Sequence, residues 1–171
     1  MAEGAGWYEV VPGSDGLQQG DVLWSCPIIV PAPELTFPLP SDAIPAVIKR
    51  FDVIIATQSC DIENDKVEEV IVCAHWDLDE ARSMDPALSK SGVDDNISKG
   101  RMPRYTFLEA SDLAEVPMGV RLVDLGRIFS LPKPFIEKFA ATQSHRLRLK
   151  SPYREYFAQR FGFFFMRVAR P

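Results

Sequence analysis

Residues 51–61 read FDVIIATQSCD, an apolar run rich in β-branched residues that stops abruptly in polar ones. Such a run predicts a buried strand. Its polar exit consists of Gln58, Ser59, Cys60 and Asp61, and functional groups are common where a strand leaves the core. The same residue types also form ordinary turns, so the exit is either a binding surface or only the end of a strand.

The length and composition of the chain are those of a globular protein. Its 171 residues fit one domain, residues 1–171, with a core of ordinary size. No apolar run reaches the length of a membrane span, and the first residues lack the features of a signal peptide. We therefore expect a cytoplasmic protein without a membrane partner.

Charge is distributed unevenly along the chain. Residues 1–100 carry 6 basic and 18 acidic side chains, whereas residues 101–171 carry 13 and 6. Such a division either steers a basic face toward nucleic acid or lets the two halves attract each other within one fold. A pI of about 5.1 favours the second interpretation.

The pattern of apolar residues and turn formers predicts a mostly antiparallel α+β fold. Strands are expected at residues 7–11, 22–30, 51–57, 67–76, 105–108, 119–131 and 145–150. Pro27 indicates an edge or a bulge. The strands at 51–57 and 67–76 are expected to pair as a hairpin, which would place Ser59 and His75 at opposite ends of the ladder. The sheet is expected to be strongly curved or closed into a small SH3-like β-barrel.

Two loops and two helices complete the expected fold. Residues 31–45 hold five prolines and predict an extended loop that can reach a partner. The polar insertion at residues 77–103 predicts one or two short helices. A helix is expected at 134–141, and another at 151–168 with Ser151 as its N-cap and Pro152 at its first position. The apolar stripe of this last helix consists of Tyr153, Phe157, Phe161, Phe164 and Val168.

The chain has few residues that could assist a catalytic or metal-binding cysteine. A Cys60 nucleophile would need His75 or His145 as its base, and no third, orienting group is identifiable. A metal site would have to use Cys26, Cys60, Cys73 and His75, whose spacing is not that of a zinc finger. No glycine-rich phosphate loop is present. We therefore expect neither a metal nor a cofactor.

Basic and apolar residues alternate at 145–150, which predicts a half-buried strand with a cationic face made of Arg146, Arg148 and Lys150. Arginines close to aromatic residues can hold single-stranded RNA by charge and stacking. The alternative is that the same aromatic residues form the apolar stripe of the last helix and are not exposed.

The order of the segments is similar to that of the MazF/PemK family of toxins. The similarity rests on Gly20-Asp21-Val22-Leu23, Val53-Ile54-Ile55-Ala56-Thr57, Val70-Ile71-Val72-Cys73-Ala74, the strand near 120–128 and the terminal helix. The resemblance implies an SH3-like barrel, a homodimer, RNA cleavage without a metal, and inhibition by an antitoxin.

The resemblance also implies roles for individual residues. The family has an Arg-Pro pair before the strand that begins here at Phe51, and only Arg50 stands at that place, as a stabiliser of a scissile phosphate. The family's threonine has no match, because this chain reads Cys73-Ala74-His75 there. Apart from the resemblance, if the chain cleaves RNA, we expect His75 or Asp61 to move protons and the cationic strand to hold the phosphate backbone.

Two functions remain at this point. The first is a toxin-like or defence-associated barrel that contacts RNA or a protein partner, either with or without cleavage of RNA through Arg50, His75 and Asp61. The second is a non-catalytic protein-interaction module that binds through the proline-rich loop. In both, Gln58, Ser59 and Cys60 shape a binding surface.

Overall fold

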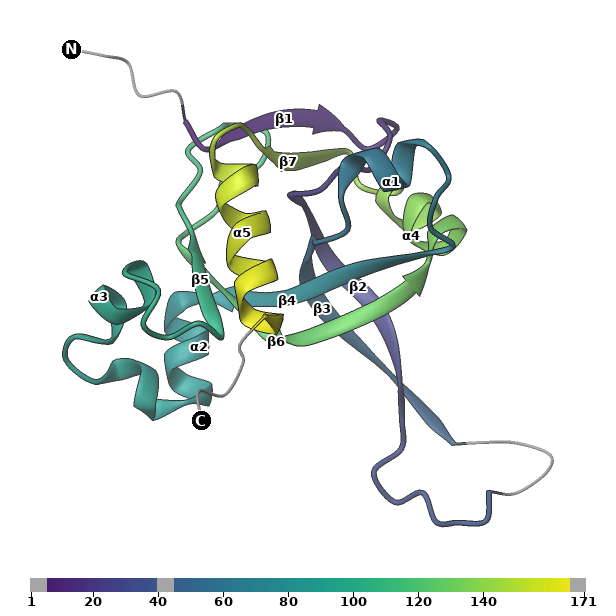
Figure 1. Cartoon of the computed structure of the whole chain (residues 1–171). Helices are drawn as coiled ribbons and strands as arrows, with labels where there is room; N and C mark the ends of the chain where they lie inside the picture. Colours follow the sequence, from purple (N-terminus) through teal and green to yellow (C-terminus); the bar gives the residue numbers. More distant parts are fainter. Residues whose placement is uncertain (1–5, 40–44, 167–171) are drawn as a thin grey trace.

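Seven strands form one antiparallel sheet in the computed structural model, which describes residues 6–39 and 45–166 (Figure 1). The strands are β1 (Tyr8–Pro12), β2 (Asp21–Pro31), β3 (Ala46–Ile55), β4 (Glu69–Asp77), β5 (Tyr105–Leu108), β6 (Arg121–Pro132) and β7 (His145–Leu149). Their order across the sheet is β1-β7-β2-β3-β4-β6-β5. The expected α+β class and the antiparallel pairing are confirmed.

The sheet stays open in the part of the chain that the structure describes. β1 and β5 are its two edges, and no hydrogen-bonded ladder joins them. The expectation of a closed SH3-like barrel is therefore not confirmed, although the expected antiparallel sheet with a C-terminal helix is present.

The β2–β3 hairpin extends beyond the rest of the sheet. Its ladder runs from Val22 opposite Ile54 to Pro31 opposite Ala46, and a bulge interrupts it between Leu23 and Cys26. The bulge of β2 comes two residues before the expected irregularity at Pro27. Beyond the bulge, β2 and β3 pair only with each other and project from the body as a two-stranded ribbon (Figure 1). We call residues 29–39 and 45–50 the ribbon.

The predicted hairpin of residues 51–57 and 67–76 is confirmed. β3 and β4 pair from Asp52 opposite His75 to Ile55 opposite Val72. Between them the expected polar turn contains a short helix, α1 (Ser59–Glu63). Ser59 and His75 consequently lie at opposite ends of the ladder, as expected.

Helices cover both faces of the sheet. On one face, Phe157 of helix α5 (Tyr153–Phe165) belongs to the same apolar cluster as Val22, Ile54 and Cys73. On the other face, Ile136 of helix α4 (Lys133–Ala140) packs in a second cluster with residues that include Val53 and Val72. The inner parts of β2, β3 and β4 are thus buried from both sides.

The polar insertion packs as a small helical cover at one end of the sheet. It contains α2 (Leu78–Met84), the 3-10 helix η1 (Pro86–Ser89) and α3 (Val93–Ser98). Asp77 and Asp85 begin α2 and η1 by accepting hydrogen bonds from the backbone two residues later. Their apolar residues form a third cluster around Leu122 of β6.

Helix α5 differs in detail from the predicted helix. It begins at Tyr153 with Pro152 as its N-cap, so Ser151 is not the cap. Phe157 is the member of the expected stripe that is fully buried, and Val168 lies outside the described residues. No helix in residues 6–39 and 45–166 has the length and apolar character needed to cross a membrane.

Candidate functional site

The polar exit of β3 is fixed by the turn that precedes β2. The backbone N–H of Gln19 donates a hydrogen bond to Ser59 Oγ at 3.0 Å, and its side-chain amide donates to the Ala56 carbonyl at 2.7 Å. Gln58 is the N-cap residue of α1, but its side chain makes no capping hydrogen bond. Gln58 is exposed.

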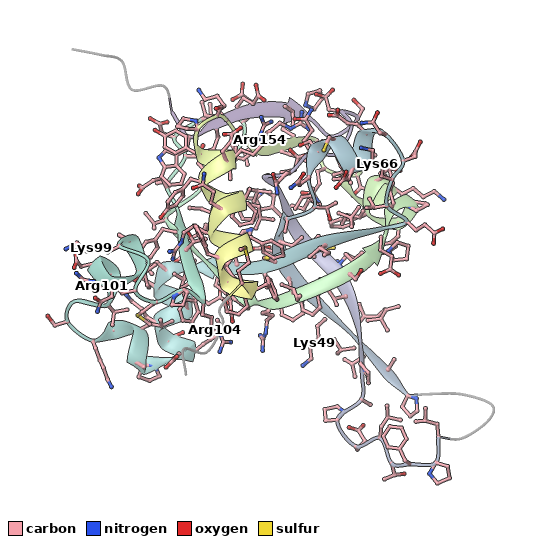
Figure 2. All side chains as sticks on the ribbon, in the orientation of Figure 1. Lys49, Lys66, Lys99, Arg101, Arg104 and Arg154 are labelled. Atoms are coloured by element: carbon pink, nitrogen blue, oxygen red, sulfur yellow. The ribbon has the colours of Figure 1, made fainter. Side chains whose placement is uncertain are left out.

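Two neighbouring pockets open at this exit. The first, of about 360 Å³, lies between Gln58, Asp61 and the α5 residues Phe161 and Gly162. The second, of about 410 Å³, is lined by residues that include Gln58, Ser59, Cys60 and Arg154. Arg154 is near the start of α5 in Figure 2. The predicted binding residues Gln58, Ser59 and Cys60 thus line a hollow surface, and what binds there stays a prediction.

The thiols have no catalytic partner in their described contacts. Cys60 is exposed, and its Sγ lies 3.7 Å from both Gln58 Oε1 and Asp61 Oδ1, neither of which belongs to a histidine. Burial raises the pKa of Cys26 and of Cys73 to about 12. Among residues 6–39 and 45–166, no three His, Cys, Asp or Glu side chains form a group that could hold a metal ion.

His75 lies inside the sheet and is held by Arg121. The Arg121 Nε donates to His75 Nδ1 at 3.1 Å, and its Nη2 donates to Asp52 Oδ2 at 2.5 Å. Burial first, and then the positive charge of Arg121, lowers the pKa of His75 to about 3. A proton-transfer group works best with a pKa near the working pH. His75 is therefore neutral at pH 7, with its proton acceptor already occupied.

Arg50 lies at the outer end of the same polar chain. Ser25, in the β2 bulge, has a φ of 55° and donates its N–H to Asp52 Oδ1 at 2.9 Å, while its carbonyl accepts from Arg50 Nη1 at 3.5 Å. Arg50 and His75 are thus linked through Ser25, Asp52 and Arg121. Trp24 covers this group, with the Arg121 guanidinium 5.2 Å from its ring centroid.

Asp61 does not join this chain. It lies in α1, beyond the end of β3 that is opposite to His75, and its carboxylate is 3.9 Å from Lys66 Nζ. The three predicted catalytic residues are consequently not brought to one place. We name the connected residues Ser25, Arg50, Asp52, His75 and Arg121, together with Trp24, the cross-sheet cluster.

The prediction that β7 exposes a cationic face is wrong. Arg146 and Arg148 are both buried and share the buried carboxylate of Asp21, with N–O distances of 3.2 Å and 2.6 Å. Carbonyl groups of the 13–16 turn accept their remaining donors, including Gly13 at 2.6 Å. The physical reason is that the turn at residues 13–16 and Asp21 cover the side of β7 that carries the two arginines, while Leu147 and Leu149 belong to the apolar cluster under α5. Of the three predicted residues, only Lys150, just past the strand, is partly exposed.

A partly exposed aromatic strip lies on the sheet between two helical covers. Phe51 and Phe129 pack beside the cluster under α4, and Trp76 packs beside the cluster under the insertion. The Phe51 ring is 5.0 Å from that of Phe129 and 6.5 Å from that of Trp76. The exposed Arg127 lies over both Phe51 and Trp76, at 5.8 Å and 5.5 Å. We call these four residues the aromatic strip.

The ribbon exposes apolar side chains without a core behind them. Ile29 and Ile48 are direct cross-strand partners, and they are 73% and 66% exposed. Phe37 in the connecting loop is 82% exposed. Lys49, where the ribbon leaves the body in Figure 2, adds positive charge beside them.

A scan against models of known protein families and a search among curated proteins both found no match. The function therefore has to be argued from the chain itself. Sequence reasoning missed Asp52, the contact of Arg121 with His75, and the Ile29–Ile48 pair. The sequence did contain a signal for the Ile29–Ile48 pair, because the segments on both sides of the proline-rich loop are apolar. It did not show that these two side chains are exposed.

Proposed function

We propose that the protein is a non-catalytic interaction module that binds a protein partner through its ribbon. The observation that carries this proposal is the cross-strand pair Ile29–Ile48, which is exposed on a projecting hairpin. Contiguous apolar surface that is exposed to solvent is often a site of interaction with another protein. Burying one such side chain contributes about 1.5–3 kcal/mol, so covering both is a substantial gain for a complex.

The length of the ribbon supports the same function. A two-stranded hairpin without a core is marginally stable in water. Here the ladder continues from the body to Pro31 opposite Ala46, although nothing in the described chain covers its outer end. A partner that packs against the apolar pair would hold the ribbon in one conformation.

The charge of the ribbon indicates the chemistry of the partner surface. Lys49 and Arg50 are exposed directly beside Ile48, and Glu34 is the acidic residue in the described part of the ribbon. Complementary charges steer association and fix register. We infer a partner with an apolar groove flanked by carboxylates.

The experiment compares the intact protein with an Ile29→Asp variant as baits in a lysate of the source organism. Phe163→Asp is the matched control, because Phe163 is an exposed apolar residue on α5, 62% exposed. A protein retained by wild type and Phe163→Asp, but lost with Ile29→Asp, is then purified. Calorimetry with the pure partner should show binding that Ile29→Asp weakens more than about tenfold.

Sedimentation of the pure protein completes this test. A dimer that Ile29→Asp converts to a monomer would identify the partner as a second copy of the chain, in line with the expected homodimer. Binding that is equally strong for wild type and Ile29→Asp, in every partner found, would disprove the role of the ribbon.

RNA contact is a second candidate, and the aromatic strip favours it. Phe51, Trp76 and Phe129 are partly exposed on a sheet surface, and Arg127 has no ion pair among the described residues. Aromatic rings and guanidinium groups on a sheet surface can stack with the bases of single strands. This is the contact expected of a toxin-like protein, and the MazF/PemK resemblance, with its SH3-like barrel, remains a proposal.

The RNA candidate is tested by fluorescence anisotropy with a labelled single-stranded RNA at several salt concentrations. Arg127→Gln should weaken binding several-fold and reduce the salt dependence, whereas Lys138→Gln on α4 should not. No binding at low salt would rule out the candidate.

Catalysis has less support than binding. The neutral, buried His75 and the separate position of Asp61 supply no pair of proton-transfer groups. Incubating RNA with wild type and with Arg50→Ala tests the predicted ribonuclease directly. Cleavage that is lost in Arg50→Ala would restore that function.

A further inference from the structure

A third pocket, separate from the ribbon and the aromatic strip, lies where four segments meet. Its volume is about 450 Å³, which is within the range of small-molecule sites. It is bounded by Trp7 before β1, by the end of α3, by β5 and by the first turn of α5. We propose that this pocket binds an organic cation, a quaternary or protonated amine with an apolar body. We call it the Trp7 pocket.

Aromatic rings make up much of the wall. Trp7 and Tyr153 are stacked, with ring centroids 4.4 Å apart and planes inclined by 13°. Phe107 and Tyr156 also line the pocket, and Tyr156 is 39% exposed. The faces of such rings carry partial negative charge and attract alkylammonium groups, most strongly those of Trp.

Glu109 supplies a full negative charge at the same wall. Its side chain is exposed and has no ion pair among the described residues. Its backbone carbonyl accepts a hydrogen bond from the Tyr8 hydroxyl at 2.8 Å, which fixes the position of the residue. The negative charge of Glu109 adds to burial in raising the pKa of Tyr8. A cation in the pocket would therefore meet a carboxylate that has no other partner.

Lys150 lies beside the pocket, because its backbone N–H donates to the Trp7 carbonyl at 2.9 Å, but it is not one of the lining residues. No Lys, Arg or His is among the lining residues. Lys99, the C-cap residue of α3, is paired with Asp95 at 2.7 Å, and Arg154 on α5 is paired with Glu155 at 3.1 Å. Arg160 donates to the carbonyl of Tyr105 at 2.8 Å. The unpaired charge that lines the pocket is negative.

The aromatic rings and the Glu109 carboxylate together favour one class of ligand. A neutral aromatic molecule would use the rings but leave Glu109 without a partner, and an anion would be repelled by it. A quaternary ammonium group uses both. A small quaternary amine and the trimethylated side chain of a lysine share this group, so the experiment includes both sources.

Binding is measured by calorimetry and by saturation-transfer NMR with benzyltrimethylammonium. Benzyl alcohol and benzoate are the neutral and anionic controls, and N-acetyl-trimethyllysine amide represents a methylated protein. We expect the benzyl cation to bind at least about tenfold more tightly than either control. Tighter binding of the lysine derivative would point to a modified protein as the source, and weaker binding to a small amine.

Two substitutions separate charge from aromatic contact. Glu109→Gln should weaken cation binding by about 5- to 10-fold, while Glu115→Gln, an exposed carboxylate outside the pocket, should not change it. Tyr156→Leu keeps an apolar side chain but removes the ring, and it should weaken binding several-fold. Thermal unfolding of each variant verifies the fold.

Three results would overturn the proposal. These are equal affinity for benzyl alcohol and the cation, an unchanged affinity in Glu109→Gln, and no binding of any probe at millimolar concentration. Because none of them depends on the ribbon, they are independent of the proposed protein partner.

Discussion

The inner part of the β2–β3 hairpin and the ribbon are both rich in Val and Ile, yet their surroundings differ. Ile54 of the inner part is 0% exposed, whereas Ile48 of the ribbon is 66% exposed on the same strand. β4 borders β3 only at residues 52–55, and β7 borders β2 only at Asp21 and Val22. Burial along one continuous ladder is therefore set by neighbouring strands and helices, and the uncovered part is available to a partner.

The largest effect is expected at the innermost residue of β2. Asp21→Ala removes the carboxylate that Arg146 and Arg148 share and leaves both guanidinium groups buried without it. Breaking a buried pair in this way costs about 3–5 kcal/mol. Urea unfolding followed by circular dichroism measures this loss. Asp15→Ala is the control, because the exposed Asp15 is 4.0 Å from Arg148 and should contribute less than about 1 kcal/mol.

The next effect concerns the core of the hairpin. Ile54→Ala should lower the free energy of unfolding by about 2–5 kcal/mol, because it leaves a cavity in a fully buried cluster. The measurement is again urea unfolding. If Ile54→Ala cost no more than a surface substitution, the inner part would not be the buried core described above.

The next prediction concerns His75, at the boundary between the two regions, and the dependence of stability on acidic pH. The pKa of His75, opposite Asp52, is about 3 in the folded protein against 6.5 in the unfolded chain. Above pH 6.5 the imidazole is neutral in both states. As the pH falls below 6.5, His75 becomes protonated in the unfolded chain but stays neutral in the folded protein. The free energy of unfolding should therefore fall by about 1.4 kcal/mol per pH unit.

This slope is measured between pH 6.5 and 5 by urea unfolding, in wild type and in His75→Gln. The variant should lose the His75 part of the slope, whereas His145→Gln, at an exposed position, should keep it. An identical slope in wild type and His75→Gln would mean that His75 takes up its proton in the folded protein.

The smallest effect is expected on the ribbon. Ile48→Thr removes apolar surface that contacts water, and Thr fits a strand, so the free energy of unfolding should change by less than about 0.5 kcal/mol. The measurement is urea unfolding of the pure protein. A loss comparable to that of Ile54→Ala would show that the ribbon is packed against the body in solution.

Much of the fold was predictable because local patterns specified it. The strand at 105–108 and the hairpin around residues 59–66 followed from β-branched runs and turn formers. The insertion of β7 between β1 and β2 was not predictable, because pairing between distant segments leaves no local signal. The alternation at 145–150 suggested one exposed face, because the turn at residues 13–16 that covers Arg146 and Arg148 is also distant in the sequence.

The candidate site was predictable only in part. Gln58, Ser59 and Cys60 were expected on a surface and line a pocket. His75 was singled out by residue type, but its burial and its contact with Arg121 depend on a strand 46 residues away. The aromatic strip likewise combines residues of three strands. Each of these residues is ordinary in its local sequence.

The position of β7 also constrains the order of folding. Among the described strands, β1 pairs only with β7, about 135 residues later in the chain. The N-terminal strand therefore has no partner on a ribosome until nearly the whole domain has been synthesised. Such long-range pairing raises contact order and slows folding. In pulsed hydrogen exchange during refolding, the amides of residues 8–11 should become protected no earlier than those of residues 145–149.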